Sequence, residues 1–182
     1  MLLSYNRLVG LVEQGVINAP IENISGASID ITLSKDILIE KFFGHFNQTE
    51  VDLKNKEVLK MKEVDISDEP YLLSPSQFIL ASSEETFNLP NNIACEYKLK
   101  SSLARCGLQH MLAGWCDPGW NNSKLTLELK NVTNHHFLIL TEGMKIGQMV
   151  FFECEPVPEE NSYAIKGQYN NQSTVTGSKG VK

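Results

Sequence analysis

The sequence predicts a mainly β fold, a jelly-roll-like sandwich or distorted β-barrel, with a short N-terminal helix and a flexible C-terminal tail. Short apolar segments rich in β-branched and aromatic residues recur along the chain, and clusters of Pro, Gly and Asn separate them. This pattern is typical of strands joined by turns. Only the first residues show helical spacing, and one helix followed by many short strands favours a sandwich or barrel.

The predicted helix lies at the N-terminus. Ser4 is suited to the N-cap, and Gly15 is suited to a left-handed position at the C-terminal end. Three apolar residues follow Ser4 at helical spacing: Leu8, Leu11 and Val12. Over residues 27–34 the apolar period changes to two, which predicts the first half-buried strand.

Further strands are predicted along the rest of the chain. They cover residues 77–83, 92–100, 124–131, 136–141 and 148–157. Residues 51–65 fit an edge strand or a helix, because their alternation is imperfect and their lysines suit either surface. Residues 158–182 are polar and rich in turn formers, so we expect a tail that is frayed or is ordered only by a ligand or a neighbouring subunit.

Composition places the chain among globular proteins. With 182 residues, 42% hydrophobic and 21% charged, it suits a single domain over residues 1–182. The net charge of −6 argues against a nucleic-acid partner, yet local cations can still bind a small anion. No apolar run approaches the roughly 20 residues needed to cross a membrane, and no signal peptide is evident. We therefore expect no membrane partner and a cytoplasmic location, in a bacterium or in the host of a virus.

The segment 100–131 concentrates the candidate functional residues. Arg105 is one of only two arginines, and a guanidinium is well suited to hold phosphates. Ser101 and Ser102 could cap a short helix through Ala104 and bind an anion at its start. Alternatively, the serines only cap a turn and Arg105 pairs with a surface carboxylate.

Two carboxylates in this segment also have two interpretations. Asp117 begins an Asp-Pro-Gly turn between two tryptophans, which could bring the carboxylate to a ligand or could serve the turn alone. Glu128 shares a strand face with Lys124, Thr126 and Lys130. That face points to solvent, unless it borders a cleft or an interface where Glu128 could act as a general base.

Several catalytic motifs are missing from the sequence. It contains neither the zinc-deaminase signature nor H-E-x-x-H, and it contains no P-loop, G-x-G-x-x-G or G-x-S-x-G motif. We therefore expect no catalytic metal bound by the protein, and in particular no zinc.

Four blocks in order resemble the dCTP deaminase family of the trimeric dUTPase-like superfamily. They are SSLARCGL (101–108), AGWCDPGW (113–120), LTLELKN (125–131) and EGMKIGQMVFF (142–152). A weaker likeness extends to ASIDITLS (27–34) and to YNNQ (169–172). The resemblance implies a dUTPase-like subunit in a homotrimer, with active sites where subunits meet.

The resemblance also implies roles for single residues. Ser101, Ser102 and Arg105 would hold the triphosphate and help to position the attacking water. Glu128 would be the general base, and the Ala113 carbonyl would help to hold that water. Asp117 would contact the sugar. Three residues of the tail would close over the nucleotide: Tyr163, Tyr169 and Gln172. Magnesium would bind through the triphosphate.

The chain departs from the family pattern at three places. Lys100 replaces a usual arginine, so it can neutralise phosphate but cannot grip two oxygens in one plane. Residues 173–174 stand where a glycine is expected. Gly114 and Trp115 replace a His-Arg pair, as in the bifunctional members that also convert the product to dUMP and pyrophosphate.

The predicted activity is hydrolysis of dCTP to dUTP and ammonia, followed by cleavage to dUMP if the chain is bifunctional. One alternative is a dUTP pyrophosphatase in which Asp117 activates the water, because IGQMVFF (146–152) also resembles that enzyme. Another is a nucleotide-sensing regulator that binds a triphosphate without turnover. Besides dCTP, the nucleotides considered are dUTP and dTTP, the latter as an inhibitor.

Overall fold

The computed structural model describes residues 1–41 and 50–181. The helices are α1 (Tyr5–Glu13), α2 (Ser101–Ala104) and α3 (Tyr163–Lys166), with short 3-10 turns η1 (Ile21–Asn23), η2 (Leu53–Asn55) and η3 (Glu159–Asn161). The strands are β1 (Ile29–Glu40), β2 (Met61–Asp65), β3 (Tyr71–Leu73), β4 (Phe78–Phe87), β5 (Ile93–Leu99), β6 (Leu108–His110), β7 (Trp115–Cys116), β8 (Ser123–Asn131), β9 (Leu138–Leu140) and β10 (Lys145–Glu153).

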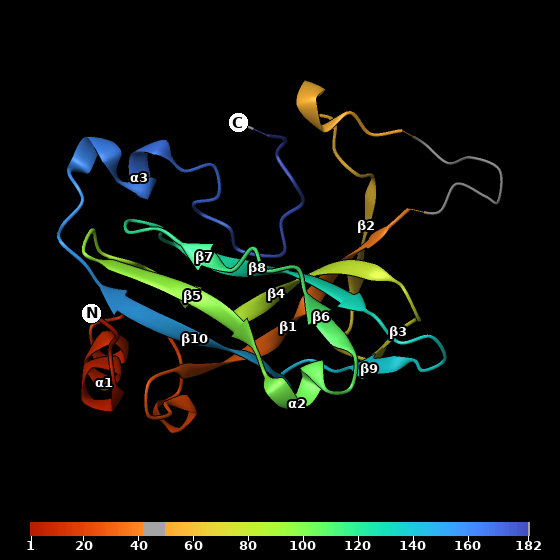
Figure 1. The fold of residues 1–182 in the computed structure, drawn as a ribbon, viewed down its shortest axis with the longest axis horizontal. Helices are drawn as coiled ribbons and strands as arrows, with labels where there is room; N and C mark the ends of the chain where they lie inside the picture. Colours follow the sequence, from red (N-terminus) through yellow and green to blue (C-terminus); the bar gives the residue numbers. More distant parts are fainter. Residues whose placement is uncertain (42–49, 182) are drawn as a thin grey trace.

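Most of the strands belong to one curled antiparallel sheet (Figure 1). Its order is β6-β8-β4-β1-β10-β5-β7, with β2 paired to β1, while β3 and β9 form a separate two-stranded ladder. The long strand β1 makes the corner, because it pairs with β10 at its start and with β4 and β2 further on. The mainly β prediction is therefore confirmed.

Glu85 fills the corner of the sheet. The ladder of β1 shifts register after Ile31, and the Thr32 backbone N–H turns to the Glu85 carboxylate, 3.0 Å from Oε2. The Thr32 hydroxyl donates to the same carboxylate at 2.8 Å. Burial raises the pKa of Glu85 above its ordinary value, and the bonds from Thr32 oppose that rise. A buried carboxylate thus satisfies donors that the bend leaves without a strand partner.

Strand alternation places the hydrophobic core on one face of the sheet. In β8, Leu125, Leu127 and Leu129 are buried, whereas Thr126 and Glu128 on the other face are partly exposed. The helix α1 packs its buried leucines against the same core, and Gly15 beyond it has a φ of +71°. The predicted helix and the alternation predicted for β8 are both confirmed. The strand predicted over residues 27–34 is present as the start of β1, but it is not half-buried, because Asp30 between Ile29 and Ile31 is buried too.

Two local predictions differ from the structure. Residues 51–65 form neither one helix nor one strand, because η2 and β2 are separate elements joined by a loop. The strand predicted over 148–157 runs from Lys145 to Glu153 instead. Pro156 and Pro158 lack the N–H that a ladder needs, so the chain leaves the sheet before them.

The tail beyond Pro158 docks on the outer face of β8 (Figure 1). The Lys124 backbone N–H donates to the Gln172 carbonyl at 2.8 Å. Val175 is buried and packs with Leu38 and Leu80 in a small second cluster. The tail, which we expected to be frayed or to be ordered by a ligand or a neighbouring subunit, thus makes contacts with its own chain. None of the helices in the described part of the chain is long and apolar enough to cross a membrane.

Candidate active site

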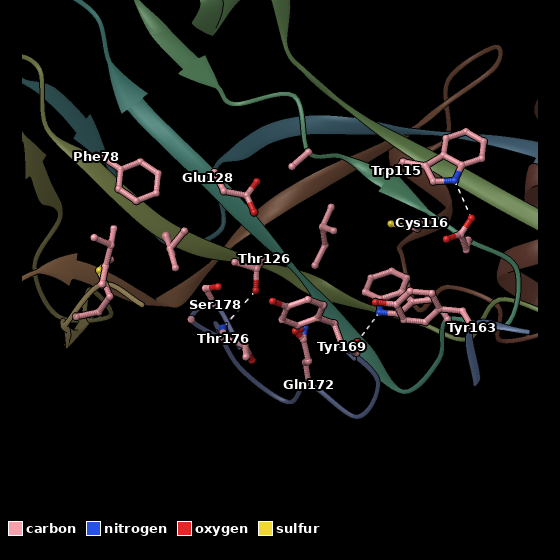
Figure 2. Close-up of a pocket in the computed structure, with 18 residues that line it drawn as sticks. Phe78, Trp115, Cys116, Thr126, Glu128, Tyr163, Tyr169, Gln172, Thr176 and Ser178 are labelled. Carbon is pink, nitrogen blue, oxygen red and sulfur yellow. Dashed lines mark hydrogen bonds between the residues drawn. The ribbon is translucent and has the colours of Figure 1, made fainter. Parts of the chain in front are cut away.

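A pocket of about 430 Å³ lies between the tail and the outer face of β4 and β8 (Figure 2). Six of the predicted site residues line it: Ala113, Asp117, Glu128, Tyr163, Tyr169 and Gln172. They come from β8, from the segment around β7 and from the tail. The fold thus gathers residues that lie up to 59 positions apart in the sequence, since Ala113 and Gln172 are at numbers 113 and 172.

Glu128 projects into this pocket from the middle of β8. It is directly opposite Leu80 of β4 in the ladder, and its side chain is 28% exposed. Figure 2 shows Phe78 on one side of Glu128, and Trp115 and Tyr163 toward the other end of the pocket. The carboxylate therefore borders a cleft, and the interpretation of Glu128 as a purely solvent-facing residue is wrong.

The tail builds the opposite wall of the pocket. Trp120 Nε1 donates to the Tyr169 carbonyl at 2.7 Å, and the Thr176 N–H donates to Thr126 Oγ1 at 3.2 Å. Gln172 is only 7% exposed, and its buried Oε1 has no hydrogen-bond partner among the described residues. A buried amide with unused bonding capacity at a pocket wall is suited to a polar, planar ligand.

Asp117 serves the turn and the pocket together. Its Oδ1 accepts a hydrogen bond of 2.9 Å from Trp115 Nε1. Two residues on, Gly119 has a φ of +87°, and a Cβ there would lie 1.9 Å from Ser162 Oγ, so the turn requires glycine. Partial burial raises the pKa of the neighbouring Tyr163, which keeps this phenol neutral.

The predicted phosphate-binding residues lie elsewhere. In Figure 1, α2 lies on the side of the sheet away from the tail. Ser101, Ser102 and Arg105 are exposed, and their side chains make no hydrogen bond or ion pair to the rest of the described chain. The N-cap position of α2 is Lys100, so the prediction that a serine caps this helix is wrong, and so is the pairing of Arg105 with a carboxylate of its own chain.

Lys100 is held by a carboxylate. Its Nζ lies 2.5 Å from Asp30 Oδ1, and Lys145 Nζ lies 3.1 Å from Oδ2. Burial alone would raise the pKa of Asp30, but the bonds from Lys100 and Lys145 outweigh it and keep the pKa below its ordinary value. A carboxyl group whose pKa is lower in the folded chain than in the unfolded chain stabilises the fold at pH values above its unfolded-state pKa. That stabilisation is lost as the pH falls through the lower, folded-state pKa.

We expect Asp30→Asn to lower the free energy of unfolding by about 1–2 kcal/mol at pH 7, because two ammonium groups lose a charged partner. The difference from wild type should shrink toward pH 3, because the carboxyl of the unfolded chain gains a proton near its ordinary pKa of about 3.9 while the pKa of Asp30 in the folded chain is lower. Denaturant unfolding at both pH values measures it, with exposed Asp68→Asn as the control. An equal loss at both pH values would contradict the ion-pair explanation.

His110 is a feature of the pocket surroundings that the sequence analysis missed. It is the last residue of β6, three positions before Ala113, and it is 4% exposed. Its Nε2 is 3.3 Å from Glu128 Oε2. The only sequence signal is a histidine in a short apolar segment, and most such residues have a packing role. Only the pairing of β6 with β8 brings it to the glutamate.

Comparison with known proteins identifies relatives over most of the chain. Residues 2–154 match the family model described as dCTP deaminase-like. The dUMP-forming dCTP deaminase of Corynebacterium efficiens is 37% identical, over 81% of this chain and 79% of that protein. Its counterpart from Salinispora tropica is 35% identical, over 98% of this chain and 94% of that protein.

The fold also has a solved relative. The crystal structure of 2′-deoxycytidine 5′-triphosphate deaminase from Agrobacterium tumefaciens superposes with a TM-score of 0.63 at 19% identity. The match covers 82% of this chain and 47% of that one, so this chain spans about half the length of that structure. At this identity the similarity shows that the two chains share a fold.

Proposed function

Because the chain belongs to the dCTP deaminase family, we propose that its pocket binds dCTP and hydrolyses the C4–N bond to release ammonia. The observation that carries this proposal is the position of Glu128, which the LTLELKN block brings into one pocket with Ala113 and Gln172. A carboxylate, a carbonyl and an amide around one cavity can hold a water and read a pyrimidine edge.

The reaction needs one group that accepts and returns protons. Glu128 takes a proton from the water while the water oxygen adds to C4, and this proton passes to N3. The new C4 hydroxyl then gives its proton through Glu128 to the exocyclic amine, the C4–N bond breaks and ammonia leaves. The base now carries a C4 carbonyl and an N3 proton, which is uracil.

We further propose that the dUTP is cleaved in the same site to dUMP and pyrophosphate. The curated relatives are named as dUMP-forming enzymes. The structure favours glycine at position 114, because a Cβ there would lie 2.9 Å from the Tyr97 carbonyl oxygen. Trp115 holds Asp117 through its indole N–H, which keeps one carboxylate oxygen in a fixed direction at the pocket.

The triphosphate is proposed to bind between subunits of a homotrimer. Arg105 and the α2 serines have no partner among the described residues of their own chain, and the pocket of that chain lacks a cation from α2. An α2 segment from a neighbouring copy would supply the missing groups. The exposed cross-strand pair Leu72 and Ile139 on β3 and β9 offers apolar surface for such an interface.

Catalysis is proposed to need no zinc. In residues 1–41 and 50–181, no three His, Cys, Asp or Glu side chains group as a metal site. We propose that a magnesium ion binds through the phosphates of the substrate instead and would neutralise part of their charge.

The products of dCTP incubation with Mg²⁺ test this proposal. We expect ammonia and dUMP, whereas ammonia with stable dUTP would restrict the chain to deamination. Rapid cleavage of dUTP with inert dCTP would support a pyrophosphatase instead. Tight binding of dCTP or dTTP without any product would support a nucleotide-sensing regulator.

A further inference from the structure

His110 Nε2 and one carboxylate oxygen of Glu128 are buried together next to the proposed reaction centre. The Met111 N–H donates to the Glu128 carbonyl at 3.0 Å, and His110 pairs with Leu129 in the β6–β8 ladder. These backbone contacts hold the end of β6 beside Glu128. The His110 Nε2 and Glu128 Oε2 atoms lie 3.3 Å apart.

These two atoms complement each other. Both are buried, and neither has a well-aligned hydrogen-bond partner within the described residues. A buried polar atom without a partner costs about 1–3 kcal/mol, so a small rotation that aligns the pair is favourable. Catalytic hydrogen bonds are often long in the free enzyme and tighten with substrate bound. A carboxylate can only accept, so the Nε2 atom must carry the hydrogen.

Packing keeps the imidazole in place. The Tyr97 ring contacts His110 edge-on, with ring centroids 4.7 Å apart and an interplanar angle of 61°. Gly147 leaves room for Tyr97, since a Cβ there would lie 2.1 Å from its ring. Burial raises the pKa of Tyr97, so the ring stays a neutral phenol. Within the described residues, Glu128 is the charged group that lies against His110.

We propose that His110 is a positioning residue that holds Oε2 of Glu128, so that Oε1 is the oxygen that takes and returns the proton. The proposal rests on the proposed deaminase function and assigns different roles to the two oxygens of the Glu128 carboxyl group. An N–H directed at Oε2 disfavours a proton on that oxygen and leaves Oε1 for the water and for N3. His110 itself touches no substrate atom in this role.

A matched pair of variants tests the role of His110. His110→Met removes the donor at similar length, and we expect it to lower kcat for dCTP deamination roughly 10–100-fold with little change in KM. His110→Gln keeps an N–H near the position of Nε2 and should recover most of the rate. Thermal unfolding of both variants checks that the fold is retained.

The same substitution in a second background separates positioning from structure. In a Glu128→Ala protein, His110→Met should leave the residual rate unchanged, because the carboxylate it holds is already gone. Three outcomes would overturn the role. They are a wild-type kcat in His110→Met, an equal loss of kcat in the Met and Gln variants, and an additive loss in the Glu128→Ala background. A wild-type chain inert toward dCTP would instead overturn the proposed function, and this role with it.

Discussion

Replacing Glu128 by glutamine is expected to lower kcat for dCTP deamination by about 10²–10⁴-fold, the range of a lost general acid–base group. Glutamine keeps the size of the side chain and most of its contacts on β8, but its amide cannot take a proton from water. The KM for dCTP should change little, because the other pocket residues that face the nucleotide are intact. Ammonia release under saturating dCTP and Mg²⁺ measures the effect.

Glu84→Gln is the matched control for this substitution. Glu84 lies on β4, is largely exposed and pairs with Lys124 at 3.0 Å, outside the pocket lining. Both changes remove one negative charge from neighbouring strands, so a general electrostatic effect would lower both rates. Near-wild-type deamination by the Glu128→Gln enzyme would mean that another group activates the water.

Local patterns predict the strands of this protein well, because burial on one face of a strand has a period of two. The β8 segment shows this clearly, since its leucines are buried and Glu128 lies on the other face. Alternation could not show what that other face borders. The pocket wall opposite Glu128 comes from the tail, whose docking depends on backbone hydrogen bonds and on one apolar anchor, Val175.

The family resemblance, rather than spacing, singled out the site residues. It grouped Glu128, Asp117 and Gln172, which the structure brings into one pocket, with Arg105, which follows α2 and does not line that pocket. It did not indicate His110, because its contact with Glu128 depends on the register of β6 against β8. Register between distant segments is set by the whole sheet, and single residues in a sequence carry little of that information.

The division of the site residues between two places leads to a second large effect. If α2 of one copy completes the pocket of its neighbour, Arg105→Ala should be nearly inactive alone, as Glu128→Gln is. Mixed trimers of the two variants should regain activity. A site then works when its pocket comes from the Arg105→Ala chain and its α2 from the Glu128→Gln chain, which is the case for about a third of the sites in a mixed trimer.

Co-expression of the two variants with different affinity tags, followed by tandem purification and assay, measures this recovery. The matched control pairs Glu128→Gln with Asp117→Ala, since both residues line the pocket of one chain and every mixed site keeps one defect. Recovery in the first pair and none in the second requires Glu128 and Asp117 to act in one subunit while Arg105 acts from another. No recovery in either pair would mean that Arg105 reaches the pocket of its own chain, which would take a large movement of α2 across the sheet.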